Sequence, residues 1–229
     1  MSSFIFIFSL TFIPNNLPIR VNKMSTWLVY DLKNSKNLKS VIPKGTRLAY
    51  FPVFKGDSSK QRLLFNIYEA SSPFFSGRRL EVVTIVEQIK RPIKTHFVVL
   101  ECLSDTLLWD PISEIQMPNC RATFSTRKRR HSLNINTSKR KLSIKGKMST
   151  SRLLDKQFAV DSNYLCFFQN STKGVSLVFD ENEIMKPVTM LTKSKIDNNL
   201  WQINRGSLTH CFVHEHPMNF LSTVEDYIV

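Results

Sequence analysis

From Trp27 to the C-terminus, apolar and polar residues alternate with a period of two far more often than with a period of 3.6. A period of two is typical of β-strands, because successive side chains point to opposite faces of a sheet. Turn residues such as Pro, Gly, Asn and Asp separate the short apolar segments. The pattern predicts about ten strands, over residues 27–32, 47–54, 63–70, 80–86, 96–103, 106–109, 157–161, 164–169, 175–180 and 207–215.

Several of these segments are apolar on both faces. One of them has Phe97 and Val99 on one face and Val98, Leu100 and Cys102 on the other. A strand buried on both faces belongs in a closed barrel or a two-layer sandwich. Strong helical patterns are hard to find. We therefore expect a mainly β fold, either a single antiparallel β-barrel or a two-layer β-sandwich, with less than about 20% helix.

The first residues depart from the alternating pattern. Residues 4–13 are nearly all apolar and end at Pro14. The segment is too short for a membrane-spanning helix, and it lacks the basic start and small-residue cleavage site of a signal peptide. We interpret residues 1–23 as an N-terminal extension or weak targeting segment, and residues 24–229 as a single β domain. Cleavage of this segment, or translation from Met24, stays open.

Most of the excess positive charge lies in one segment. The chain has 32 Lys and Arg against 18 Asp and Glu, a formal net charge of +14. Residues 121–150 are rich in Ser, Thr, Lys and Arg, and residues 127–147 contain nine basic residues and no acidic one. Like charges at this density repel, so we expect a basic flexible loop at about 121–150 that interrupts the domain. Locally alternating apolar residues make a two-stranded extension the alternative.

The predicted loop contains a candidate basic patch, made of Arg127, Lys128, Arg129, Arg130, Lys139, Arg140 and Lys141. Such clusters act as nuclear-localisation signals or bind nucleic acid or anionic lipid, so an anionic partner is one interpretation and a solvated loop is the other. No aromatic residues lie among the charges, which speaks against stacking on single strands. The pattern favours a cytoplasmic location, with a nuclear one as the alternative and secretion less favoured.

The cysteines and the motifs exclude several classes of protein. The four cysteines are widely spaced, without a C-x-x-C pair, which indicates reduced thiols rather than a disulfide framework or a zinc site of paired cysteines. The sequence lacks G-x-x-x-x-G-K-[ST], G-x-G-x-x-G, G-x-S-x-G and H-E-x-x-H. These absences argue against P-loop NTPases, dinucleotide-binding folds, serine hydrolases and zincins. The sequence identifies no cofactor and no integral membrane span.

Three of the five histidines lie in one predicted strand, in the segment His210–His216. A period of two puts His210, Phe212, His214 and His216 on one face. His210, His214 and His216 are weak candidate metal ligands, and they are also candidates for a polar pocket or a hydrogen-bonded core. We predict that His210, in mid-strand, is the most buried of the three and that His216, beside Pro217, is the most exposed.

A second ionisable group lies on another predicted strand. Arg79 and Glu81 share a face with Val83 and Ile85. The pair is desolvated if that face points inward, and it forms a solvated rim if the face points outward. We expect Glu81 to contact His210, with Arg205 or His96 close to the same cavity. The candidate ligand-binding residues are therefore Glu81, His96, Arg79, Arg205, His210 and His214.

The segment Ser72-Pro73-Phe74 leading to Arg79-Leu80-Glu81 resembles the glutamate-bearing strand of acetoacetate-decarboxylase-like barrels. The resemblance covers this short segment only, and it implies a barrel fold. The lysine pair that carries Schiff-base chemistry in that family has no counterpart after Trp109, where Asp110-Pro111 stands. No catalytic residue is therefore carried over.

Three functions follow from these observations. The first is a soluble β-barrel protein that binds a small, largely apolar ligand in the barrel interior. The second is an enzyme that uses the histidine-rich strand as an acid/base or metal centre. The third is a basic interaction module that acts through residues 127–147.

Overall fold

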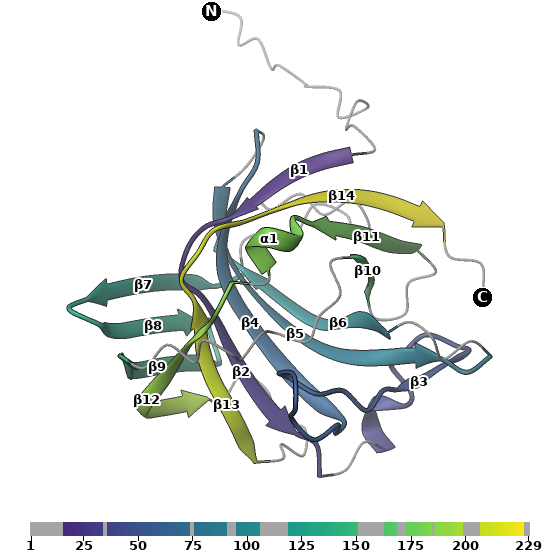
Figure 1. The fold of residues 1–229 in the computed structure, drawn as a ribbon, viewed down its shortest axis with the longest axis horizontal. Helices are drawn as coiled ribbons and strands as arrows, with labels where there is room; N and C mark the ends of the chain where they lie inside the picture. Colours follow the sequence, from purple (N-terminus) through teal and green to yellow (C-terminus); the bar gives the residue numbers. More distant parts are fainter. Residues whose placement is uncertain are drawn as a thin grey trace, which may run out of the picture.

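The protein is mainly β in the computed structural model, which describes residues 16–33, 36–73, 76–90, 95–105, 119–150, 163–168, 173–184, 186–198 and 207–226 (Figure 1). Helix in these ranges is limited to a single 3-10 turn, η1 (Lys36–Leu38), and the four-residue α1 (Glu181–Ile184). No helix within them is long and apolar enough to cross a membrane. The expected mainly β fold with little helix is confirmed.

Fourteen strands form one continuous sheet within the described ranges. They are β1 (Asn16–Val21), β2 (Ser25–Asp31), β3 (Thr46–Leu48), β4 (Arg62–Ser71), β5 (Ser76–Gln88), β6 (Thr95–Ser104), β7 (Arg121–Arg127), β8 (Arg130–Asn136), β9 (Lys141–Met148), β10 (Asn163–Phe168), β11 (Lys173–Phe179), β12 (Thr189–Asn198), β13 (Leu208–His214) and β14 (Met218–Asp226).

Seven of these strands form a ring. The backbone pairings lead from β4 through β5, β6, β10, β11, β14 and β1 back to β4. All neighbours in the ring are antiparallel except β6 and β10, which run parallel. The shortest pairing in the ring joins β1 and β4, where Arg20 faces Ser71 and Val21 faces Ala70. The inner face of the ring carries a hydrophobic core, which we call the inner core, that includes Leu64, Val83 and Phe97.

The strand β1 corrects the domain boundary expected at residue 24. It lies within the predicted extension of residues 1–23, yet it pairs with β14 from Asn16 to Val21 and completes the ring. Pro18 hid this strand from the sequence pattern, because proline removes a backbone donor and is rare inside sheets. At Pro18 the described pairing runs to β14 alone, which is the edge-like position where proline is tolerated.

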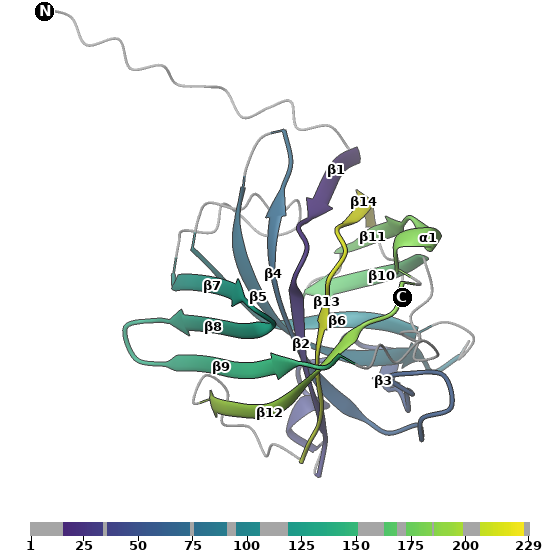
Figure 2. The same cartoon turned by 60° about the vertical axis from the view of Figure 1, so that its left-hand side comes forward.

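The sheet continues from the ring into a second layer. The first part of β4 pairs with β2, and the order then runs through β13, β12, β9 and β8 to β7. In Figure 2, the strands β7, β8, β9 and β12 lie together on one side of the molecule, with β10 and β11 on the other. A second hydrophobic core, the outer core, combines residues of β7–β9 with Leu28, Phe65 and Val82 from the main sheet. The protein therefore combines a ring and a sandwich.

The basic flexible loop expected at 121–150 is wrong, because this segment forms β7, β8 and β9. Its apolar residues Leu133, Ile135, Leu142 and Ile144 are at most 1% exposed and belong to the outer core. The prediction counted the charges without assigning them to a face. The basic residues alternate with the apolar ones and lie on the solvent side, so burial of the apolar face outweighs the repulsion between charges.

Polar contacts also join the two layers. The buried His131 of β8 lies between two threonines, with Nε2 2.9 Å from Thr26 Oγ1 and Nδ1 2.8 Å from Thr126 Oγ1. Thr26 belongs to β2 of the main sheet, so this histidine links the layers. Arg78 of β5 forms an ion pair with Asp105 and donates a hydrogen bond to a backbone carbonyl of β7.

Candidate functional site

A row of polar side chains crosses the inner face of the sheet. Cross-strand partners point to the same face, and the register pairs His214 with Ser25, Asn66 with Glu81, and Glu81 with Cys102. The Ser25 hydroxyl donates a hydrogen bond to Asn66 Oδ1 at 3.1 Å. The strands β2 and β13 extend the inner face beyond the ring, since Trp27 and Phe212 belong to the inner core. We call the polar row Ser25, Asn66, Tyr68, Arg79, Glu81, Cys102 and His214.

The centre of the polar row is an ion pair with a tyrosine. Arg79 Nε lies 2.8 Å from Glu81 Oε1, and the Tyr68 hydroxyl donates to the same oxygen at 3.0 Å. Arg79 and Tyr68 are buried, whereas 16% of the Glu81 side chain is exposed. The sequence left two orientations of the Arg79 and Glu81 pair open, and the structure places the pair on the inner face. Tyr68 was not predicted, although its alternation with Leu64 on the same strand would have placed it there.

The electrostatics of this centre favour neutral groups. Burial raises the pKa of Tyr68 well above its ordinary value, and the charge of Glu81 raises it further. The tyrosine is therefore a neutral donor at physiological pH. The charges of Arg79 and Glu81 cancel at close range, so the centre offers hydrogen bonds without a net charge.

His214 lies at one end of the polar row and is 4% exposed. Its Nδ1 lies 3.0 Å from the backbone carbonyl oxygen of His216, so Nδ1 carries the proton and Nε2 is left as an acceptor in the neutral ring. Within the described residues, the buried Nε2 meets no hydrogen-bond partner. Burial is the main cause that lowers the pKa of His214. The backbone contacts with His216 and Glu183 raise this pKa, and the positive charges of His216 and Lys186 lower it. The imidazole is accordingly neutral at pH 7.

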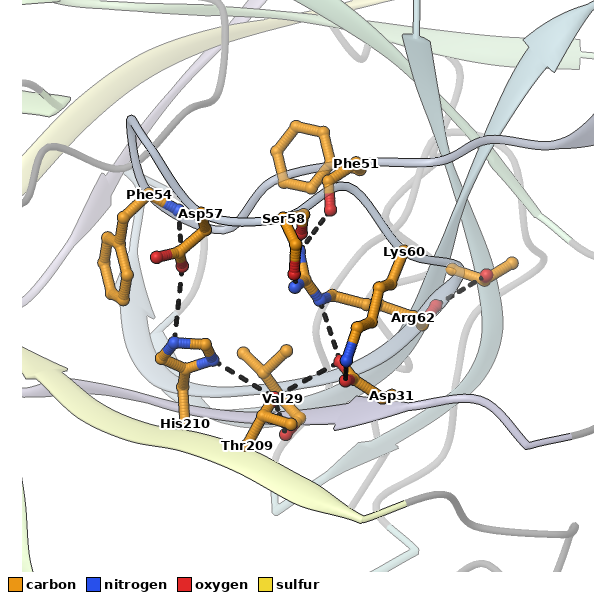
Figure 3. Close-up of polar contacts among 11 residues, drawn as sticks. Val29, Asp31, Phe51, Phe54, Asp57, Ser58, Lys60, Arg62, Thr209 and His210 are labelled. Carbon is orange, nitrogen blue, oxygen red and sulfur yellow. Dashed lines mark hydrogen bonds and ion pairs between the residues drawn. The ribbon is translucent and has the colours of Figure 1, made fainter.

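His210 lies at the other end of its strand and contacts a loop (Figure 3). Its Nε2 is 3.3 Å from Asp57 Oδ2, and its ring packs edge-on against Phe54 with centroids 5.3 Å apart. The same carboxylate oxygen accepts a hydrogen bond from the Phe54 amide at 3.3 Å. The partner expected for His210 was Glu81, and this prediction is wrong. His210 is also less buried than His214, because β13 begins at Leu208 and the exposed Thr209 precedes His210.

The loop of residues 49–61, between β3 and β4, places apolar side chains in the inner core. Phe51, Val53 and Phe54 are at most 6% exposed and all belong to this core. Arg62, 3% exposed, holds the loop in place. It donates to the Ser58 carbonyl at 2.9 Å and to the Phe51 carbonyl, and its Nε lies 3.1 Å from Asp31 Oδ1 (Figure 3). The strand predicted over residues 47–54 ends at Leu48, and the sequence pattern did not indicate this anchor.

The other predicted site residues do not join the polar row. His96 is buried, but its cross-strand partner Val86 belongs to the outer core, so His96 lies on the opposite face of the sheet from Glu81. Arg205 lies outside the described residues. His216 follows the end of β13 and is partly exposed. Among the residues that the structure describes, no group of three or more His, Cys, Asp and Glu side chains is arranged to hold a metal ion.

The predicted basic patch divides into two turns. Residues 127–130 surround the β7–β8 turn, in which Lys128 and Arg129 have positive φ values of 47° and 63°. Residues 139–141 lie at the β8–β9 turn, at the other end of β8. Seven strand residues separate the two turns by about 20 Å. Arg129 donates to the backbone carbonyls of residues 148 and 149, and Arg140 forms an ion pair with Glu101. The seven residues therefore do not form one patch.

The fold resembles that of a known enzyme. No family model and no curated protein matches the sequence. The structure is similar to that of an acetoacetate decarboxylase from Legionella pneumophila, with a TM-score of 0.52 and 6% sequence identity, over 96% of this chain and 91% of that chain. At this identity the likeness concerns the fold alone. The barrel that the resemblance of the segment from Ser72 to Glu81 implied is consistent with this fold.

Proposed function

We propose that this protein binds a small, largely apolar molecule against the inner face of the ring, with a neutral polar group of the ligand at Tyr68, Arg79 and Glu81. The observation that carries the proposal is the ion pair at 2.8 Å in the polar row, on the face that also carries the inner core. Replacing a buried ion pair by apolar residues often leaves stability unchanged or raises it. Stability alone therefore does not account for charged residues at this position.

The charge balance of the centre defines the class of ligand. Arg79 is already neutralised by Glu81, so an ionised carboxylate would bring an uncompensated charge into a desolvated site. A ketone or aldehyde brings no charge, and it can accept a hydrogen bond from the Tyr68 hydroxyl when this group turns from Glu81 Oε1 to the ligand, since that oxygen stays paired with Arg79. The side chain of Glu81 is partly exposed, so this centre is in contact with solvent at Glu81. We therefore propose a neutral carbonyl compound with an apolar chain.

The structural neighbour is named for acetoacetate, whose ketone is a carbonyl group of the kind proposed here and whose carboxylate is not. The proposal does not extend to decarboxylation. Among the lysines whose side chains the structure describes, none is buried, and the sequence has no counterpart of the lysine pair after Trp109. The enzymatic alternative keeps one observation in its favour, the acceptor nitrogen Nε2 of His214. This nitrogen lies at the far end of the polar row, so ligand binding at Glu81 and acid–base chemistry at His214 are separable.

Binding of 2-octanone, measured by titration calorimetry, tests the proposal. We expect saturable binding at one site and weaker binding of octanoate. Tyr68→Phe removes one hydrogen-bond donor and should weaken the binding of 2-octanone about fivefold to tenfold, which corresponds to about 1–1.4 kcal/mol. Tyr30→Phe is the matched control, since Tyr30 is equally buried but belongs to the outer core.

Three results would contradict the proposal. The first is the absence of saturable binding by the unmodified protein. The second is tighter binding of octanoate than of 2-octanone. The third is an equal loss of affinity in the Tyr68 and Tyr30 variants, which would point to a general effect on stability.

A further inference from the structure

The solvent face of the second layer carries a regular array of basic side chains. Cross-strand register places Arg127 of β7 opposite Arg130 of β8, and Arg130 opposite Lys147 of β9. In the adjacent row, Lys145 of β9 lies opposite Lys195 of β12. All five side chains are exposed. We call Arg127, Arg130, Lys145, Lys147 and Lys195 the basic face.

The five side chains share one face because their neighbours are buried on the other. His131, Leu133 and Ile144 alternate with them along β8 and β9 and are at most 2% exposed. Adjacent strands are about 4.8 Å apart, so four strands spread the charges over about 14 Å. The basic face therefore lies on four paired strands, in contrast to the flexible loop that the sequence indicated.

The basic face lacks compensating charges. Residues 121–150 contain no Asp or Glu, and the single acid of β12 is Asp197, which lies opposite Ser143 and two strand positions from Lys195. Within the described ranges, none of the five basic side chains forms an ion pair. Like charges directly opposite each other on a sheet destabilise the pairing. Folding of the layer therefore does not explain the array.

The next row of the same surface is polar and uncharged in three of its four positions. It consists of Thr123, Asn134 and Ser143, followed by Asp197. Ser143 Oγ donates to Asn134 Oδ1 at 2.8 Å, and Asn134 Nδ2 lies 3.5 Å from Thr123 Oγ1. Hydroxyl and amide side chains beside Lys and Arg are typical of surfaces that contact phosphate and sugar.

We propose that the basic face binds the phosphate backbone of double-stranded nucleic acid without reading its sequence. The exposed side chains of this face include no aromatic residue, which argues against single strands, since these bind by stacking of bases on aromatic rings. They also include no large apolar residue, and the exposed large apolar residues found elsewhere are Tyr50, Ile89, Val178, Leu208 and Leu221. A membrane-binding surface uses such residues as anchors in addition to basic charge. Binding to the phosphate backbone of a duplex requires only the basic charges.

Salt dependence provides the test. Each neutralised phosphate releases counterions, so the logarithm of the binding constant falls with the logarithm of the salt concentration with a slope of about −0.9 per contact. Five contacts predict a slope of about −4.5 for the full chain on a 20-base-pair DNA duplex, measured by fluorescence anisotropy between 50 and 200 mM NaCl. A parallel titration with an RNA duplex shows whether the basic face binds DNA or RNA duplexes more tightly.

Paired substitutions assign the binding to this face. Arg130→Gln with Lys147→Gln removes two neighbouring charges, and we expect a slope smaller by about 1.8 and affinity lower by about 10- to 100-fold at 100 mM NaCl. Lys44→Gln with Lys90→Gln removes the same net charge from exposed loop residues outside the second layer. This control variant should keep the slope and the affinity of the unmodified protein. Circular dichroism checks that both variants are folded.

Four outcomes would overturn the proposal. They are no binding to either duplex at 50 mM NaCl, an equal loss in the control variant, binding of a 20-nucleotide single strand at least as tight as that of the duplex, and tighter binding to vesicles containing 30% phosphatidylserine than to the duplex. The last outcome would assign the basic face to a membrane surface. None of them bears on the inner face of the ring, where the ligand is proposed to bind.

Discussion

His131 and His214 are buried in surroundings that disfavour their charged form. Burial lowers the pKa of both side chains. In the unfolded chain each would titrate near its ordinary value of about 6.5. As the pH falls below that value, the unfolded state takes up protons that the folded state does not. The stability contributed by the neutral histidines is therefore present above about pH 6.5 and is lost as the pH falls toward their folded pKa values.

We expect His131→Gln to reduce this loss of stability. The amide side chain can still contact Thr26 or Thr126, but it does not titrate. Urea unfolding at pH 7.5 and pH 5.5 gives the free energy of unfolding of each protein. The difference between the two pH values should be smaller for the variant than for the unmodified protein. Ser132→Ala, which removes no titratable group from the same strand, should show the unmodified difference. An identical difference in all three proteins would contradict the assignment of this pH dependence to His131.

For single residues, the sequence pattern predicted which side chains share a face but not how deeply each one is buried. Alternation placed His210, Phe212 and His214 on one face, and the register confirms this. It did not indicate which of these residues lies near a strand end, so the order of burial of His210 and His214 was reversed. Alternation also paired Arg79 with Glu81 correctly. The direction in which their face points depends on contacts distant in sequence, which a local period does not report.

At the scale of elements, a β-bulge in β6 explains why His96 was wrongly expected near the same cavity as Glu81. A strict period of two puts His96 and Cys102 on the same face of β6. The register shifts by one residue where Val82 and Val83 face Glu101 and Val99, so the residues beyond Leu100 change faces. Cys102 therefore lies opposite Glu81 on the inner face, whereas His96 lies on the outer core side. A bulge leaves no clear signal in a single sequence, because it depends on the partner strand.

The strands β8 and β9 should be essential to the fold, contrary to what a mobile loop would imply. Leu133→Ala removes a fully buried side chain from the outer core, and we expect the free energy of unfolding to fall by about 2–5 kcal/mol. Lys139→Ala, at an exposed turn position, should change it by less than about 0.5 kcal/mol. Urea unfolding monitored by circular dichroism measures both. A Leu133 variant as stable as the Lys139 variant would show that this layer contributes little to the fold.

At the scale of the whole molecule, the sequence indicated a barrel or a sandwich, and the structure contains both. The doubly apolar strands β4, β5 and β6 explain the combination, because one face of each contributes to the inner core and the other to the outer core. The short β1–β4 ladder and the parallel β6–β10 pair complete the ring through contacts between residues far apart in the chain. Such pairings depend on the tertiary fold, so strand count alone could not establish them.

The most direct test of the proposed function is the carbonyl stretching frequency of bound 2-octanone, measured by infrared difference spectroscopy. A hydrogen bond from the Tyr68 hydroxyl weakens the carbonyl bond, so we expect a lower frequency than in hexane. The frequency should move toward the hexane value in Tyr68→Phe and stay unchanged in Tyr30→Phe. A bound carbonyl at the hexane frequency, or one unaffected by Tyr68→Phe, would contradict the claim that this centre holds the polar group of the ligand.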